Sequence, residues 1–194
     1  MPTQIAIDMD GVVADWNFSA SLFGVDAAYR AEWLRCQDLR IAVPTEVDDQ
    51  EVKRRIIDAG VAFWSSLPMT CERFPHVPHP ADLYHRACKI VGEGNVYFLT
   101  AVGDDTAPAA AMGKVMWLRK ILGNDFSEFF LCRARNKAKL SAPWRVLIDD
   151  HPRNIQQWCD ADPLASGVLF SCPSLTGPDA VEAMWQKVSK SVID

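Results

Sequence analysis

Two aspartates stand two residues apart near the start of the chain, at the end of an apolar, β-branched run. The run is Ile5-Ala6-Ile7, and Asp8-Met9-Asp10-Gly11 follows it. β-branched residues favour a buried strand, whereas ionised carboxylates require water, a cation or a hydrogen-bond donor. In extended backbone, residues two apart point to the same side, so both carboxylates can converge on one place. An acidic turn after an ordinary strand is the alternative interpretation of this stretch alone.

Three later apolar runs also end in polar residues. They lead into Thr100, into the basic stretch 135–139, and into Asp149-Asp150. The carboxyl ends of parallel strands lie at one edge of a sheet, where ligands bind in open α/β folds. We therefore expect four acids, one hydroxyl and two or three cations to meet at that edge.

This set of residues suits phosphoryl transfer. Several carboxylates around one point repel one another unless a cation lies between them, and Mg²⁺ prefers such oxygen ligands. A lysine and a hydroxyl suit the oxygens of a phosphate. An ionised aspartate can attack phosphorus, and a second acid can protonate the leaving oxygen and then activate water. The sequence thus predicts a reaction through an aspartyl-phosphate, with Mg²⁺ as cofactor.

The elements that must position these residues alternate between strand and helix from about residue 82 onward. This alternation predicts an α/β fold with a parallel sheet that helices cover on both faces. Strands are expected at 5–7, 95–100, 129–132, 145–150 and 167–170. Helices are expected at about 14–24, 27–39, 48–59, 82–91, 107–122, 154–159 and 178–192. The segment 16–74 lacks the alternation, so we expect a small helical cap there and an α/β core at 1–15 and 75–194.

Size and charge limit the classes of partner. The chain has 194 residues, of which 49% are hydrophobic, enough for one core with a small appendage. A net charge of -5 argues against a nucleic acid polymer or an anionic membrane as partner. The first four residues lead straight into the first strand, and no apolar run reaches membrane-spanning length. We expect a cytoplasmic protein with reduced cysteines and a small-molecule partner, and we leave a homodimer open.

The polar segments resemble, in order, the four motifs of the haloacid-dehalogenase-like (HAD) phosphatases. The matching residues are Asp8-Met9-Asp10-Gly11-Val12, Thr100, Lys137 and Asp149-Asp150. Residues 7–16, 114–126 and 147–155 are further similar to the 5'(3')-deoxyribonucleotidases. The segment 16–69 matches in placement, as a small cap, but weakly in sequence. The resemblance implies a Rossmann-like HAD core with a helical cap inserted after the first strand.

The resemblance also implies roles for the four acids. Asp8 would be the nucleophile and a Mg²⁺ ligand. Asp10 would be the general acid and base, and would bind Mg²⁺ through its backbone carbonyl. Asp149 would be a Mg²⁺ ligand, and Asp150 would support the metal shell through water.

On the phosphate side, the resemblance implies that Thr100 and Lys137 bind the phosphate and that Lys137 also pairs with Asp8. Arg135-Asn136-Lys137 is similar to the family's Arg-Asp-Lys, which favours Lys137 and places Arg135 near the substrate. Lys139 stays the alternative, because an alignment without gaps before Asp149 selects it.

Aromatic residues could hold a nucleobase by stacking. Trp16 falls where the family has an aromatic that meets the base, and Phe63 and Trp64 could close over it from the cap. Ordinary core packing is the alternative for Phe63 and Trp64. At Ala101 the chain departs from the family's usual Ser-Pro, in a loop that faces the substrate, so the base preference stays open.

We therefore expect a Mg²⁺-dependent phosphatase that hydrolyses nucleoside 5'-monophosphates, with deoxyribonucleotides favoured. One alternative keeps the chemistry and changes the substrate to another small phosphate ester, such as a sugar phosphate. The other is a catalytically idle HAD-like domain that binds a phosphoryl ligand or a protein.

Overall fold

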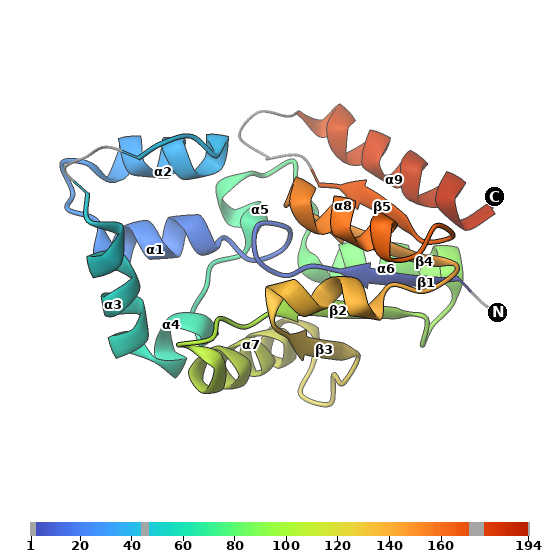
Figure 1. Ribbon diagram of the computed structural model, residues 1–194, viewed down its shortest axis with the longest axis horizontal. Coiled ribbons are helices and arrows are strands. Elements are labelled where there is room, and N and C mark those ends of the chain that lie inside the picture. Colours follow the sequence, from blue (N-terminus) through green and yellow to red (C-terminus); the bar gives the residue numbers. More distant parts are fainter. Residues whose placement is uncertain (1–2, 44–46, 171–176, 194) are drawn as a thin grey trace.

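The computed structural model describes residues 3–43, 47–170 and 177–193. In this part of the chain, five parallel strands form one sheet in the order β3-β2-β1-β4-β5 (Figure 1). The strands are β1 (Gln4–Ile7), β2 (Val96–Ala101), β3 (Phe129–Cys132), β4 (Arg145–Asp149) and β5 (Ser166–Leu169). β1 is central, and its Ile7 pairs with Phe98 of β2 and Ile148 of β4. The four strands expected to carry the site are therefore neighbours.

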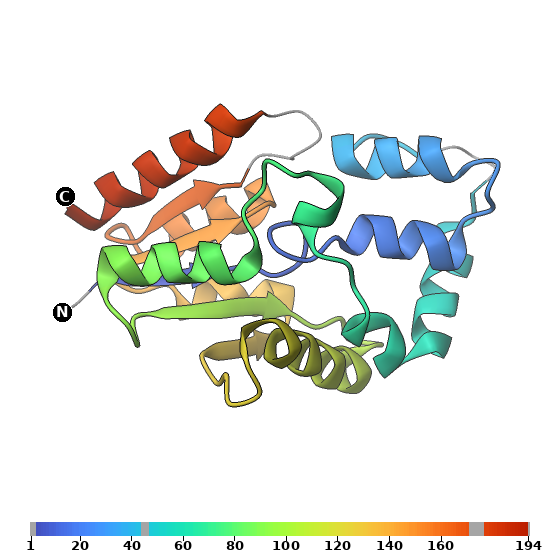
Figure 2. The same cartoon turned by 180° about the vertical axis from the view of Figure 1, so that it is seen from behind.

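Helices cover both faces of the sheet, as Figures 1 and 2 show from opposite sides. The helices that follow the segment 16–74 are α6 (Pro80–Val91), α7 (Ala107–Leu122), α8 (Pro152–Ala161) and α9 (Pro178–Ile193). Helices α6 and α9 pack on one face, and α8 packs on the other. The predicted α/β fold class is confirmed.

The alternation of side chains along β1 explains why its sequence is apolar throughout. Ile5 and Ile7 belong to the larger core, with Phe98, whereas Ala6 belongs to a smaller core with Trp158 of α8. Both faces of a parallel sheet are buried, so its strands need no polar side. The first carboxylate, Asp8, comes only where the strand has ended.

The segment between β1 and α6 is largely helical, as predicted. It contains α1 (Trp16–Gly24), α2 (Arg30–Leu39), α3 (Asp49–Ala59), α4 (Val61–Ser65) and α5 (Thr70–Arg73). The chain returns beside its point of exit, because Asp15 N–H donates to the Pro68 carbonyl at 2.8 Å. The ranges 16–74 for a cap and 1–15 with 75–194 for a core stay a prediction.

Two short helices of this segment, α4 and α5, were not predicted. Of these, α4 packs tightly on α7, where a Cβ at Gly113 would collide with Trp64. A helix of five residues is too short to show a periodic apolar pattern, so only this tertiary contact defines it. Similarly, the expected basic loop after β3 forms a short 3₁₀ helix, η1 (Ala134–Leu140).

Two further findings concern membrane-spanning helices and the cysteines. None of the helices in the described ranges is both long and apolar enough to cross a membrane. The cysteines at positions 36, 71, 88, 132 and 159 are free thiols, and Cys172 lies outside the described residues.

Candidate functional site

Three carboxylates gather at the carboxyl edge of the sheet. Asp8 follows β1, Asp149 ends β4 and Asp150 comes next, and one oxygen from each lies within 4.8 Å of the others. Oxygens on opposite sides of a Mg²⁺ ion are about 4.2 Å apart, given ligand distances of about 2.1 Å. The separation and the all-oxygen donor set therefore fit a shared divalent cation.

Several hydrogen-bond donors hold Asp149 in place. Its side chain is fully buried and accepts hydrogen bonds from His151 N–H at 2.8 Å and from the Asn154 amide at 3.0 Å. Asn154 lies in the first turn of α8, which begins at Pro152 directly after the acids. The sequence had assigned no role to Asn154, although it falls within the stretch similar to the nucleotidases.

Lys137 links two of the acids. Its ammonium lies 2.8 Å from Asp8 Oδ1 and 2.8 Å from Asp149 Oδ2, and its side chain is buried. Burial lowers the pKa of Lys137, but the charges of Asp8 and Asp149 outweigh this and raise it, so the lysine stays charged. Lys139, the alternative, is exposed on the same 3₁₀ helix. The structure brings Lys137, and not Lys139, to the acids.

Asp8 lies at the centre of this arrangement. Its Oδ1 accepts the Met9 N–H at 2.7 Å and the Lys137 ammonium at 2.8 Å. Burial raises the pKa of Asp8 to about 6, with Lys137 opposing the rise and Asp149 adding to it. The charged form thus gains from any additional positive charge at the site.

Asp10 has a different partner, Lys114, which sequence reasoning missed. The Lys114 ammonium lies 2.5 Å from Asp10 Oδ2, 2.9 Å from Thr100 Oγ1 and 2.6 Å from the Ala101 carbonyl oxygen. It also lies 5.0 Å from the centre of the Trp64 ring. A signal for it existed: Lys114 shares a helical face with Ala110 and Leu118 within the apolar run that forms α7, and all of these are buried.

The carboxylate of Asp10 does not belong to the cluster of Asp8, Asp149 and Asp150. Its Oδ2 is bound by Lys114, while Oδ1 is buried and has no hydrogen-bond partner among the described residues. Burial raises the pKa of Asp10, and Lys114 opposes the rise. A carboxyl of raised pKa with one oxygen unpartnered can hold and release a proton. The expected cation contact through the Asp10 carbonyl stays a prediction.

A cavity of about 430 Å³ opens above these groups, between the sheet edge and the helical segment. Its lining includes Asp8, Asp10 and Lys137 on the chemical side. Trp16 and Trp64 line it from the helical segment, and Ala101 lines it from the end of β2. These three expected substrate contacts therefore lie where a ligand of the acids would extend.

Two expected substrate contacts lie elsewhere. Phe63 is completely buried and packs edge-on against Phe23 and Trp64, so it belongs to the core and does not line the cavity. Arg135 is exposed and lies 3.4 Å from Asp104, which does line the cavity. The structure thus resolves Phe63 in favour of core packing and places Arg135 outside the cavity wall.

Comparison with known proteins supports the fold. No model of a known protein family and no curated protein sequence matches the chain. Among solved structures, a hydrolase from Streptococcus pneumoniae TIGR4 is similar, with a TM-score of 0.52 and 11% identity over 96% of this chain and 100% of that one.

A second similar structure is a putative haloacid dehalogenase-like hydrolase from Burkholderia xenovorans LB400. Its TM-score is 0.44, with 14% identity over 87% of this chain and 82% of that chain. At 11% identity, the likeness to the hydrolase from Streptococcus pneumoniae concerns the fold alone.

Proposed function

We propose that this protein is a Mg²⁺-dependent phosphomonoesterase that hydrolyses nucleoside 5'-monophosphates, as the resemblance to HAD phosphatases implies. The observation that carries the proposal is the placement of Asp8. It lies against Lys137 and within the carboxylate cluster of Asp149 and Asp150, on the floor of a cavity with two tryptophans in its wall. The similar structure from Streptococcus pneumoniae is described as a hydrolase, which agrees with this proposal.

In this mechanism Asp8 attacks the phosphorus of the ester. Among the described residues, the Met9 N–H and the Lys137 ammonium both contact Oδ1 of Asp8, which leaves Oδ2 available to form the new P–O bond. Asp8, Asp149 and Asp150 would hold Mg²⁺, which supplies positive charge to the phosphoryl oxygens when bound. Lys137 adds a fixed ammonium beside the nucleophile and balances the charge of the acids.

Asp10 moves the proton in both halves of the reaction. As Asp8 forms the bond to phosphorus, the P–O bond to the nucleoside breaks, and Asp10 donates a proton to the leaving oxygen. Asp10, now ionised, then takes a proton from water, whose oxygen attacks the phosphorus and breaks its bond to Asp8. Phosphate leaves and Asp10 is again protonated, so protons and bonds balance. Lys114, which also donates to Thr100 Oγ1, keeps the Asp10 carboxyl in place.

The nucleoside would occupy the rest of the cavity. Trp16 presents apolar surface there, and the largely buried Trp64 lines the same cavity. Stacking on an aromatic ring is an economical way to bind a base. The cavity volume of about 430 Å³ is in the range of small-molecule sites. Together with the negative net charge, this favours a mononucleotide over a nucleic acid polymer.

The proposal is tested by phosphate release from a panel of esters, with Mg²⁺ and with EDTA. The panel contains dUMP, dTMP, their ribonucleotide counterparts and several sugar phosphates. We expect turnover of nucleoside monophosphates with Mg²⁺, none with EDTA, and a strong preference over sugar phosphates. Asp8→Asn should abolish turnover and leave the fold intact, whereas the matched change at exposed Asp160, Asp160→Asn, should leave turnover unchanged.

The same panel separates the two alternatives. A preference for sugar phosphates would keep the chemistry and replace the substrate class. No phosphate release from any ester in the presence of Mg²⁺ would favour a catalytically idle binding domain.

A further inference from the structure

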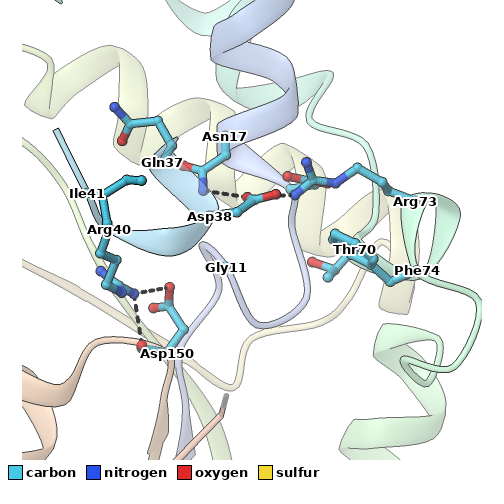
Figure 3. A pocket seen from close by; sticks show the side chains of 11 residues that line it. Gly11, Asn17, Gln37, Asp38, Arg40, Ile41, Thr70, Arg73, Phe74 and Asp150 are labelled. Atoms are coloured by element: carbon cyan, nitrogen blue, oxygen red, sulfur yellow. Dashed lines mark hydrogen bonds and ion pairs between the residues drawn. The ribbon is translucent and has the colours of Figure 1, made fainter. Parts of the chain in front are cut away.

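Arg40 joins the helical segment to the carboxylate cluster. It caps the C-terminal end of α2, and its Nη2 donates to Asp150 Oδ2 at 2.7 Å and to the Asp150 carbonyl oxygen at 2.8 Å (Figure 3). Within the segment, α2 packs on α1. The Arg40 side chain is therefore the place where α2 reaches the proposed cation site.

Arg40 has a backbone conformation that is unusual for a residue with a side chain. Its φ of 55° lies in the left-handed region, which it shares with only one other non-glycine residue of the described chain, Trp144. Glycine is the usual residue at such a helix end, because a Cβ is disfavoured there. An arginine in this place thus accepts an unfavourable backbone conformation and gains the contact with Asp150.

The surrounding cavity explains what this contact does. A cavity of about 350 Å³ lies between α2, α5 and the loop at Gly11, and both Arg40 and Asp150 line it (Figure 3). A second arginine, Arg73, also lines this cavity. Its guanidinium is 2.6 Å from Asp15 and 3.0 Å from Asp38. Both arginines in the described lining are thus paired with acids. They connect structural elements and do not form an anion-binding site.

Asp150 forms the boundary between this cavity and the larger one, since it lines both. Its carboxylate packs so closely on Gly11 that a Cβ there would collide with it. The same carboxylate belongs to the cluster that fits a divalent cation. Arg40 and such a cation would thus contact the same carboxylate.

We propose that Arg40 is a positioning residue that couples the helical segment to the cation site through Asp150. The inference rests on the cation site of the proposed function. In the absence of the cation, the Arg40 guanidinium donates two hydrogen bonds to Asp150 and holds the end of α2 against the core. A bound cation draws on the same carboxylate and repels the guanidinium, so the contact weakens. Because such coupling is reciprocal, Arg40 lowers the affinity of the site for the cation.

The test measures cation binding directly, with Mn²⁺ as the probe and electron paramagnetic resonance as the readout, without substrate. Arg40→Gly suits the left-handed backbone, so it removes the side chain without straining the helix end. We expect this variant to bind Mn²⁺ about fivefold more tightly or more, at the low end of typical couplings between sites. Arg40→Lys keeps the charge and should stay close to the wild type.

A matched control comes from the same helix. Arg35 carries the same charge and pairs with Glu32 at the surface, not with the core. Arg35→Ala should leave Mn²⁺ affinity within about twofold, because water and salt screen distant surface charges. Unchanged or weaker Mn²⁺ binding in Arg40→Gly would overturn the inference.

A second readout follows the helix instead of the cation. Hydrogen exchange of the α2 amides should become faster in the wild type when Mg²⁺ is added, and should be fast in Arg40→Gly with or without it. Slower exchange of these amides on cation binding would contradict the coupling.

These results are separable from the ester panel. Normal turnover with unchanged Mn²⁺ affinity in Arg40→Gly would overturn only the inference on Arg40. Tighter Mn²⁺ binding without any phosphate release would overturn only the proposed phosphatase. A wild-type protein that binds no Mn²⁺ overturns the coupling, and the panel then decides on the phosphatase by itself.

Discussion

The ammonium of Lys114 bridges Asp10 and Thr100, at 2.5 Å from the carboxylate and 2.9 Å from the hydroxyl. This contact joins the loop after β1 to the end of β2 through a fully buried side chain of α7. The general acid of the proposed reaction is thus oriented from an element more than a hundred residues away in sequence. The relationship makes Lys114 the most informative residue for mutation after Asp8.

Lys114→Met should retain the shape of the side chain and remove its charge. We expect kcat to fall by about 100-fold or more, because Asp10 loses its orienting donor. Loss of the positive charge also raises the pKa of Asp10 further, since Lys114 is the main group that lowers it. The pH–rate profile should therefore shift to higher pH. A profile at the wild-type position, with only KM changed, would show that Lys114 does not act on Asp10.

Lys137 and Lys139 form a natural pair for comparison, because they lie two residues apart and differ in burial. Lys137→Met should abolish phosphate release and lower the melting temperature in EDTA, since it leaves Asp8 and Asp149 without their ammonium. Removing one partner of a buried pair typically costs about 3–5 kcal/mol. Lys139→Met should change neither quantity appreciably. Equal effects of the two substitutions on turnover would refute the assignment of Lys137.

Trp16→Ala should weaken binding of nucleotide substrates more than it slows the chemistry. Stacking of a base on an aromatic ring contributes about 1–3 kcal/mol, so KM should rise by about 5- to 100-fold while kcat changes little. Trp144→Ala provides the control, because Trp144 precedes β4 and does not line the cavity. If Trp16→Ala leaves KM for every nucleoside monophosphate unchanged, the base lies elsewhere.

The raised pKa values of the acids predict how stability depends on pH and on Mg²⁺. In the fold, burial raises the pKa of Asp8 to about 6 and that of Asp150 to about 8, both above the unfolded value of about 3.9. Over that interval the native state binds more protons than the unfolded state, so stability without metal falls as pH rises from about 4 to 8. We expect the melting temperature in EDTA to decrease over this range.

Added Mg²⁺ should counter that decrease, because it binds the ionised acids of the native state. Its stabilising effect in thermal unfolding should therefore be larger at pH 8 than at pH 5. An equal effect of Mg²⁺ at both pH values would indicate that the cation does not bind these carboxylates.

The sequence by itself determined the fold class and the position of the acids in the chain. Buried parallel strands must be apolar on both faces, so the carboxylates that follow Ile7 and Ile148 could only mark strand ends. The alternation of strands and helices then placed those ends on one edge. Short-range patterns of this kind depend only on neighbouring residues, and they can therefore be predicted from the sequence.

The tertiary structure decided which side chains meet. It brings Lys137 to the acids, because the turn of η1 buries the ammonium of Lys137 beside Asp8 and leaves Lys139 exposed. It also placed Phe63 in the core and brought Lys114 to Asp10. These outcomes depend on packing between elements far apart in sequence, and a local pattern carries no record of the partner that an element will meet.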